Sequence, residues 1–268
     1  LIEFKAGSTS IEPGLAESWT SSPDGLTYTF KLRKGVKFHT TEYFTPSRDF
    51  NADDVVFSFM RMIDKNHPFR KAYNVEFPYA SDTGLDSNST AVEKTDPYTV
   101  VFKLKAPDAD LLAKIAMPFA SILSAEFGDK LMKEGKASMI NQQPVGTGPF
   151  ILKRYQKDAQ IRYAANKQYW KKGDVKVDNL IFAITTDPSV RAQKMKAGEC
   201  HIMSYPKPQD LPAMKSDPAL KVTTAPGFNI GYLAYNVEKP QLKKLEVRQA
   251  LDMAINRKAI IDAVYQGE

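Results

Sequence analysis

The stretch that decides the fold of this chain lies at residues 13–59. It reads PGLAESWTSSPDGLTYTFKLRKGVKFH over residues 13–39 and FNADDVVFSF over residues 50–59. Three patterns follow one another in it: a turn signal, a strand-like alternation of side chains and a capped amphipathic helix. Strand and helix signals in such close succession predict a mixed α/β fold.

The first half of this stretch predicts an antiparallel hairpin. Pro23-Asp24-Gly25 is a turn signal, and polar and apolar side chains then alternate over residues 27–33. We therefore expect a strand whose apolar side chains face a core, paired with the segment that ends at Trp19. Residues 36–39 are expected to continue as another short strand.

The second half predicts a helix of about a dozen residues. Asn51 is a favourable N-cap residue, and Asp53 and Asp54 follow in the first turn, where their charge meets the positive end of the helix dipole. The apolar side chains that follow at helical spacing are Val55, Val56, Phe59, Met60 and Ile63.

The rest of the chain alternates between strand and helix patterns. An apolar run at residues 179–184 suits a strand that is buried on both faces. We expect a hairpin-rich part from about residue 10 to 170 and a βαβ-like part after it. Further strands are expected at residues 97–104, 150–153, 160–163, 179–184, 200–203 and 231–235, and further helices at 110–116, 124–136, 188–197 and 246–265.

Composition limits the class of protein. The chain has 268 residues, 43% of them hydrophobic and 25% charged, which is ordinary for a globular protein. No apolar run is long enough to cross a membrane. The net charge of +6 comes from basic residues interspersed with acidic ones, which favours a solvated surface over nucleic-acid binding. Because the sequence begins without Met or a signal peptide, we interpret it as a piece of a longer protein.

Cys200 is the only cysteine and admits three interpretations. It could be a buried free thiol, or half of a disulfide whose partner lies outside this segment. A catalytic thiol is the weakest of the three, because it needs a base and an electropositive pocket. His201 is adjacent in sequence, but neighbouring residues on a strand point to opposite faces.

Other motifs do not assemble a catalytic or metal site. The sequence Gly146-Thr147-Gly148 lacks the Lys and hydroxyl of a phosphate-binding loop and is interpreted as a structural turn. Asp53 and Asp54 are adjacent on a helix and point about 100° apart, which defeats a shared proton. Without a nucleophile, base and orienting group, a peptide hydrolase remains only a rival hypothesis. The three histidines are His39, His67 and His201. They lie far apart in sequence and fit no zinc spacing.

Six segments resemble the family 5 extracellular solute-binding proteins of ABC importers. They are residues 14–19 (GLAESW), 24–30 (DGLTYTF), 32–39 (LRKGVKFH), 51–58 (NADDVVFS), 144–150 (PVGTGPF) and 247–251 (VRQAL). Their order and spacing cover essentially the whole chain. Within the family, the sequence looks closest to periplasmic dipeptide-binding proteins, on residues 190–191, 199–200, 203–206 and 227–233.

The resemblance implies a periplasmic-binding-protein-like fold of type II, cluster C, with mixed sheets and flanking helices. Such proteins form two lobes around a cleft, and this segment would cover the first lobe only. Residues 1–10 and 171–268 would form an incomplete βαβ-type subdomain of lobe I, residues 11–170 its hairpin-rich subdomain, and lobe II would be absent. The resemblance also places a cysteine before Leu1, which favours the half-disulfide interpretation of Cys200.

Three clusters are candidate ligand-binding walls. Gly227, Phe228 and Asn229 combine close backbone approach with apolar contact, although a strand after a turn explains them equally well. Tyr79 lies in a loop that reaches toward the ligand in relatives, and is otherwise amphipathic surface. Phe119 and Ser121 form the third wall, for which core packing is the stronger alternative.

The resemblance also implies a function. We expect a monomeric substrate-binding component of an ABC transporter that captures di- or oligopeptides in the periplasm and delivers them to an inner-membrane permease. It would not be an enzyme, and would need no cofactor or metal, no nucleic acid and no insertion into the membrane. Alternative ligands on the same fold are glutathione, haem, antimicrobial peptides and nickel. The charge partners of the peptide ends would lie in the absent second lobe.

Overall fold

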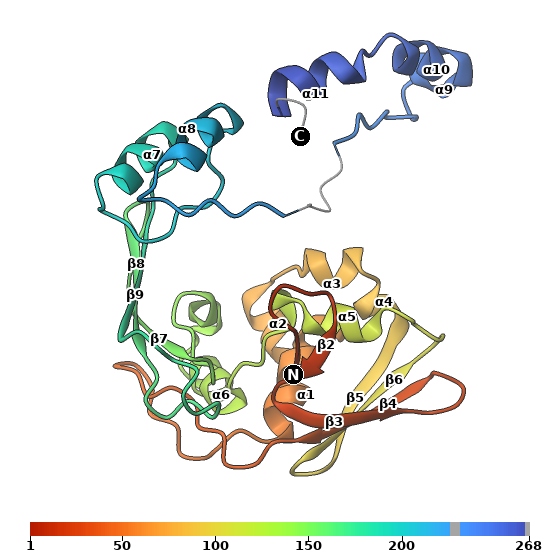
Figure 1. Cartoon of the computed structure of the whole chain (residues 1–268). Helices are drawn as coiled ribbons and strands as arrows, with labels where there is room; N and C mark the ends of the chain where they lie inside the picture. Colours follow the sequence, from red (N-terminus) through yellow and green to blue (C-terminus); the bar gives the residue numbers. More distant parts are fainter. Residues whose placement is uncertain (226–230, 266–268) are drawn as a thin grey trace. The chain divides into compact units, whose positions relative to one another are not determined.

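Figure 1 shows a computed structural model of the chain, which describes residues 1–225 and 231–265. The chain divides into two compact units, Leu1–Ala183 and Ile184–Glu268, called unit 1 and unit 2 below. Each unit is described by itself. The predicted subdomain division at residues 10 and 171 is a different division from this one and stays a prediction.

A four-stranded antiparallel sheet lies at the centre of unit 1. Its strand order is β3-β4-β6-β5. The predicted hairpin is confirmed, because β3 pairs with β4 and places Trp19 opposite Phe30. The strand β5, which was not predicted from the sequence, completes the sheet. The four strands are β3 (Ala16–Ser21), β4 (Thr27–Leu32), β5 (Ser89–Asp96) and β6 (Thr99–Leu104).

The helix α1 (Ala52–Ile63) packs against this sheet over β5 and β6 (Figure 1). The ring of Phe59 meets that of Phe102 edge-on at 4.8 Å between centroids, and Phe102 meets Phe30 at 5.3 Å. All three side chains are completely buried. Aromatic rings bury large areas and favour this edge-to-face geometry, so they hold the helix and the sheet together.

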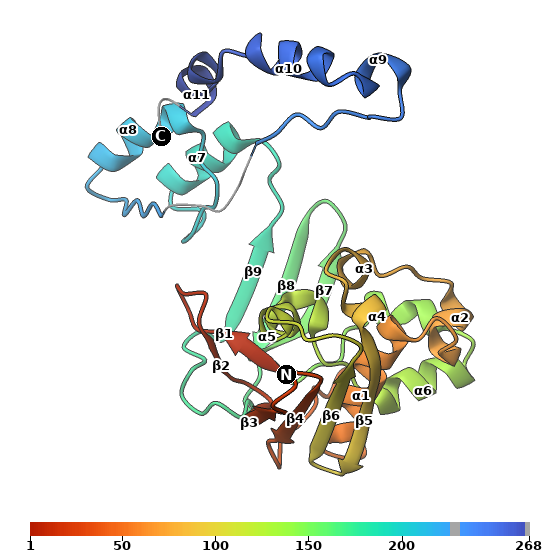
Figure 2. The ribbon, with the colours of Figure 1, turned by 90° about the vertical axis from the view of Figure 1, so that its right-hand side faces the viewer.

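Several short elements complete unit 1. The helix predicted at residues 110–116 is confirmed as α5. It contacts the two-stranded sheet β1-β2 (Figure 2). The helix predicted at residues 124–136 is confirmed as α6, with Ser124 as its N-cap. Their bounds are β1 (Ile2–Phe4), β2 (Ile11–Pro13), α2 (Pro68–Tyr73), α3 (Pro78–Asp82), α4 (Leu85–Asn88), α5 (Leu111–Ala116), η1 (Pro118–Ala120), α6 (Ala125–Lys133) and η2 (Ala137–Asn141).

A three-stranded antiparallel sheet ends unit 1. It consists of β7 (Phe150–Gln156), β8 (Gln160–Ala165) and β9 (Asn179–Ala183), and it confirms the hairpin predicted at residues 150–163. The expectation that residues 179–184 are buried on both faces is wrong here. β9 is an edge strand, and Ile181 and Phe182 are each about half exposed. An apolar run predicts a strand, but only its neighbours decide whether both of its faces are covered.

Residues 36–39 do not form the strand expected there. The amide of His39 donates to the carbonyl of Gly146 (2.8 Å), and the carbonyl of Val36 accepts from the amide of Phe50 (2.9 Å). These two bonds go to different segments, so no ladder forms, although Val36 and Phe38 are both buried.

Unit 2 is helical in its described part. The helix predicted at residues 188–197 is confirmed as α7, but residues 200–203 and 231–235 are not strands, because no described segment pairs with them. The long helix expected at residues 246–265 is interrupted before Arg257, where the side chain of Asn256 accepts from the amide of Ala259 and starts a new helix. The helices are α7 (Pro188–Lys196), η3 (Pro208–Asp210), α8 (Leu211–Ser216), α9 (Pro240–Lys243), α10 (Leu245–Met253) and α11 (Arg257–Tyr265).

Candidate ligand-binding surface

Two of the predicted ligand contacts come together in the structure. The ring of Tyr79, from α3, stacks on the ring of Phe119, from η1, with 5.9 Å between centroids and 11° between planes. The two residues lie far apart in sequence, so their meeting is a result of the tertiary fold. We call them, together with Ser121, the Tyr79 surface.

The position of Tyr79 is fixed by its neighbours in α3. Pro78 begins the helix, where a missing amide hydrogen costs nothing, and Ala80 is buried. Just before the helix, the ring of Phe77 is covered by the guanidinium of Arg61 at 4.9 Å and that of Arg70 at 5.4 Å. Tyr79 itself is 62% exposed, so the backbone is held while the side chain faces solvent.

Phe119 and Ser121 are held by a single tight turn. The amide of Ala120 donates to the carbonyl of Met117 (3.0 Å), and Ala120 is buried. Ser121 is exposed, and its hydroxyl donates to the carbonyl of Pro118 (2.6 Å). Phe119 is partly buried against the core, which agrees with the alternative interpretation of core packing. Its ring also stacks on that of Tyr79.

The chemistry of the Tyr79 surface is apolar with one polar group. The phenol oxygen of Tyr79 makes no hydrogen bond to any residue that the structure describes, so it is available to an external donor or acceptor. No ionisable group other than this phenol belongs to the surface. It is therefore suited to the apolar side chain of a ligand, with one hydrogen bond for orientation, and not to a charged ligand end.

The predictions for residues 227–229 and for Cys200 are not tested by the structure. Gly227, Phe228 and Asn229 lie outside the described residues. Cys200 is half-buried with a free thiol, and since it is the only cysteine of the sequence, a disulfide within the chain is impossible. Its pairing with a cysteine elsewhere stays a prediction.

The three histidines are dispersed. His39 is buried, and its Nε2 is hydrogen-bonded to the carbonyl of Gly148 at 2.9 Å. His67 caps α2, where its Nδ1 accepts from the amide of Phe69 (3.2 Å). His201 is exposed. Within residues 1–225 and 231–265, no group of three or more His, Cys, Asp or Glu residues could hold a metal ion.

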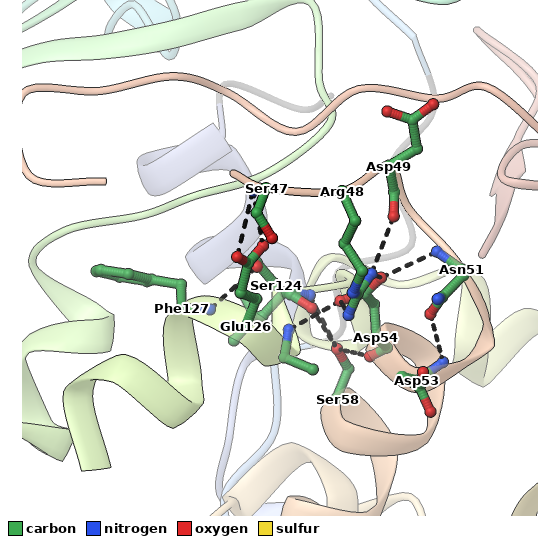
Figure 3. Close-up of polar contacts among 12 residues, drawn as sticks. Ser47, Arg48, Asp49, Asn51, Asp53, Asp54, Ser58, Ser124, Glu126 and Phe127 are labelled. Atoms are coloured by element: carbon green, nitrogen blue, oxygen red, sulfur yellow. Dashed lines mark hydrogen bonds and ion pairs between the residues drawn. The ribbon is translucent and has the colours of Figure 1, made fainter. Parts of the chain in front are cut away.

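A polar network near the start of α1 was only partly anticipated (Figure 3). The carboxylate of Asp54, expected as a helix-dipole residue, also accepts two hydrogen bonds from Arg48 (2.8 and 3.0 Å) and one from the amide of Ala125 (2.9 Å). The hydroxyl of Ser58 links α1 to the amide of Leu123 (2.8 Å). Nothing in the local sequence marks these long-range partners, which place the segment carrying Ser121.

A large surface pocket of unit 1 lies elsewhere. It has a volume of about 710 Å³ and contains none of the predicted ligand contacts. Its lining combines apolar side chains with charged ones of both signs, and the ammonium of Lys130 donates to the carbonyl of Tyr43 (2.7 Å). The residues lining it include Tyr43, Phe127, Lys130, Leu131, Glu134 and Met139.

Residues 10–268 match the family model described as bacterial extracellular solute-binding proteins, family 5. The chain belongs to this family. The predictions of family and of a binding-protein α/β fold are thereby confirmed. The family is described as one of solute-binding proteins, and the relatives reported below are named for what they bind. In the described part of the chain, no helix is long and apolar enough to cross a membrane.

Individual relatives of this family 5 protein are close. The chain is 63% identical to "Di/tripeptide-binding protein 1" of Pseudomonas aeruginosa (strain UCBPP-PA14), over 100% of this chain and 50% of the relative. It is 48% identical to "Heme-binding protein A" of Haemophilus influenzae, over 100% of this chain and 49% of that protein. A dipeptide-binding protein from Pseudoalteromonas sp. SM9913, solved in complex with Met-Leu, matches with a TM-score of 0.94 and 37% identity, over 100% of this chain and 52% of that one. The chain thus spans about half the length of its relatives.

Proposed function

We propose that the whole protein is the substrate-binding component of an ABC transporter and that it captures di- and oligopeptides in the periplasm. The observation that carries this proposal is the 63% identity to a di/tripeptide-binding protein over the entire chain. A structural match at a TM-score of 0.94 to a binding protein that holds the dipeptide Met-Leu supports it. The protein would act as a monomer and deliver its ligand to an inner-membrane permease.

The proposed mechanism is closure of two lobes around the peptide. A ligand that contacts both lobes binds the closed form better than the open form and so shifts the population toward closure. Residues 1–268 would supply one lobe, and the Asp and Arg partners of the charged peptide ends would lie in the other half. In this lobe we propose that the Tyr79 surface and residues Gly227, Phe228 and Asn229 contact the peptide.

The role of Tyr79 can be tested by titration calorimetry of the full-length protein with a panel of dipeptides. Tyr79→Ala removes the exposed ring and its free hydroxyl, so we expect about tenfold weaker binding, or ~1.4 kcal/mol. Tyr155→Ala is a matched control, because Tyr155 is also an exposed tyrosine of unit 1, at 56% exposure, but lies on β7. Equal affinities for Tyr79→Ala and the control would remove Tyr79 from the proposed site.

The proposed ligand class has its own test. Because a relative at 48% identity is named for haem, the family alone does not select peptides. Native mass spectrometry of the full-length protein as purified should reveal co-purified masses of two- to four-residue peptides, and haem added in solution should give no saturable shift of its absorption band. Stoichiometric haem binding without peptide binding would overturn the peptide assignment while leaving the family intact.

A further inference from the structure

Arg61 is a buried cation whose hydrogen bonds are not satisfied by the described residues. It lies in the last turn of α1, and the residue is only 7% exposed. Its Nε is buried with no hydrogen-bond partner, and none of its guanidinium nitrogens forms a hydrogen bond or ion pair with residues 1–225 or 231–265. A buried N–H group is costly to leave without an acceptor, so the Nε of Arg61 is free to donate to a group from outside the described residues.

Arg70 provides an internal comparison. Its exposed fraction is also 7%, and its guanidinium also faces the ring of Phe77. In contrast to Arg61, it donates to the carbonyl of Met62 (2.9 Å) and to the carboxylate of Glu76 (2.9 Å). Two guanidinium groups therefore meet one aromatic ring, but only Arg70 has an anionic partner.

The basic residues near Arg61 differ from it in having an acidic neighbour. A small pocket of about 180 Å³ beside Arg70 is lined by Lys65 and Lys71 but also by Glu76, the carboxylate that pairs with Arg70. Burial lowers the pKa of Arg61 to about 10, and the nearby phenol of Tyr73 opposes this only partly, so the guanidinium stays charged at neutral pH. An uncompensated positive charge here attracts anions of small size.

Tyr73 supplies a second donor. The side-chain amide of Asn141 donates to the phenol oxygen of Tyr73, and the O–H hydrogen of Tyr73 has no acceptor among the described residues. We propose that Arg61 and the hydroxyl of Tyr73 together form a binding site for a small inorganic oxyanion, of the phosphate or sulfate type. A planar guanidinium presents two parallel N–H groups, which match two oxygens of such an anion, and the phenol donates to a third.

Thermal denaturation of the full-length protein tests this site. We would titrate sodium phosphate, sodium sulfate and sodium acetate from zero to about 20 mM against sodium chloride at constant ionic strength. A bound ligand stabilises the native state as its concentration exceeds Kd, so phosphate or sulfate should raise the melting temperature by about 3 °C in a saturable way. Acetate is the control for the shape of the anion. It has only two oxygens, so a rise with phosphate or sulfate but not with acetate would show that the third oxygen of a tetrahedral anion is needed.

Three variants make the result specific. Arg61→Met should abolish the anion-dependent rise, and Tyr73→Phe should at least halve its size. Arg154→Met removes the same charge from an exposed position on β7 and should keep the full rise. Sulfate and phosphate stabilise most proteins by exclusion from the surface, but that effect is unsaturable, needs higher concentrations and would persist in Arg61→Met.

Two outcomes would overturn the proposal. One is a wild-type melting temperature that does not differ between phosphate and chloride. The other is an identical rise in the wild type and in Tyr73→Phe, which preserves the ring and should fold even where Arg61→Met does not. Titration calorimetry of the wild type with phosphate gives a direct reading that needs no variant. Because the site contains no residue of the Tyr79 surface, its failure would leave the proposal of peptide binding unaffected.

Discussion

Asp54 accepts more hydrogen bonds than a helix N-terminus requires. Its carboxylate is completely buried and accepts from the amide of Asn51 (3.0 Å) as well as from Arg48 and the amide of Ala125 (Figure 3). The bond to Asn51 closes the N-terminal box of α1, and the bond to Ala125 reaches the first turn of α6. One side chain therefore satisfies donors from two segments of unit 1, the loop before α1 and the start of α6.

Asp54→Asn should be strongly destabilising. The amide keeps the shape of the carboxylate but removes the charge that pairs with Arg48, and it presents a donor to groups that are themselves donors. Removing one member of a buried pair costs about 3–5 kcal/mol, which urea denaturation would measure as a lower free energy of unfolding. Asp53→Asn is the control, because its exposed pair with Lys94 contributes below about 1 kcal/mol. Similar losses for both variants would contradict the structural role of Asp54.

His39 should make stability depend on pH. Burial lowers the pKa of His39 from its ordinary value of 6.5, and the hydrogen bond to the Gly148 carbonyl opposes this only partly. Below pH 6.5 the unfolded chain therefore binds a proton that the folded chain does not, so stability falls as pH decreases from 6.5 toward the lower folded pKa. The slope contributed by one proton is at most about 1.4 kcal/mol per pH unit.

The measurement is urea denaturation of the wild type and of His39→Gln between pH 7.5 and pH 5. Glutamine places an amide nitrogen near the position of Nε2 and does not titrate. His67 also has a pKa lowered chiefly by burial, so a smaller slope should remain in the variant. Parallel stability curves for the two proteins would show that His39 does not contribute.

At the scale of elements, α1 and α6 meet where a side chain is missing. Gly128 is buried inside α6, although glycine weakens a helix by about 1 kcal/mol relative to alanine. A Cβ at this position would overlap the ring of Phe57 on α1. Phe57 in turn packs edge-on against Phe69 of α2 at 5.2 Å between centroids, so it has little freedom to move away. The glycine is therefore explained by packing between elements.

Gly128→Ala should destabilise unit 1 despite the better helix propensity of alanine. Overpacking of a tight core costs about 1–3 kcal/mol, and the smaller propensity gain offsets only part of it. Phe57→Leu makes room for the added methyl group, so the double variant should be less destabilised than the sum of the two single variants. Additive losses in urea denaturation would mean that Phe57 and Gly128 do not restrict each other.

Elements with local signals could be predicted from the sequence, and elements that depend on distant partners could not. The helix α1 follows from Asn51 and the first-turn aspartates, and the β3–β4 hairpin follows from a turn and a short alternation. The segments at residues 200–203 and 231–235 have strand-like sequences, but a strand exists only where another strand pairs with it.

The same distinction applies to the two candidate sites. Tyr79 and Phe119 could each be named from the sequence as a candidate contact, but their stacking depends on how α3 and η1 pack. Arg61 could not be singled out at all. On an amphipathic helix it resembles any basic residue of the last turn, and only the burial of its Nε without a partner distinguishes it.

At the scale of the whole molecule, the core is unevenly distributed. In unit 2 the buried apolar side chains among the described residues are Ala192 and Met214, whereas all others lie in unit 1. Unit 2 instead exposes large apolar side chains, among them Ile202, Tyr205 and Met253, each 85% exposed. Folding is driven mainly by the removal of apolar surface from water, so the two units should differ greatly in stability.

Hydrogen–deuterium exchange of the chain comprising residues 1–268 should reveal this difference. Amides of α1, β4 and β6 should exchange only through global unfolding, because their side chains fill the common core. Amides of α10 and α11 should exchange orders of magnitude faster, because no described side chain of either helix is buried. Asp54→Asn should accelerate exchange in α1 and leave α10 unchanged. Equal protection of α1 and α10 in the wild type would mean that the stability of unit 2 rests on more than the packing described for it.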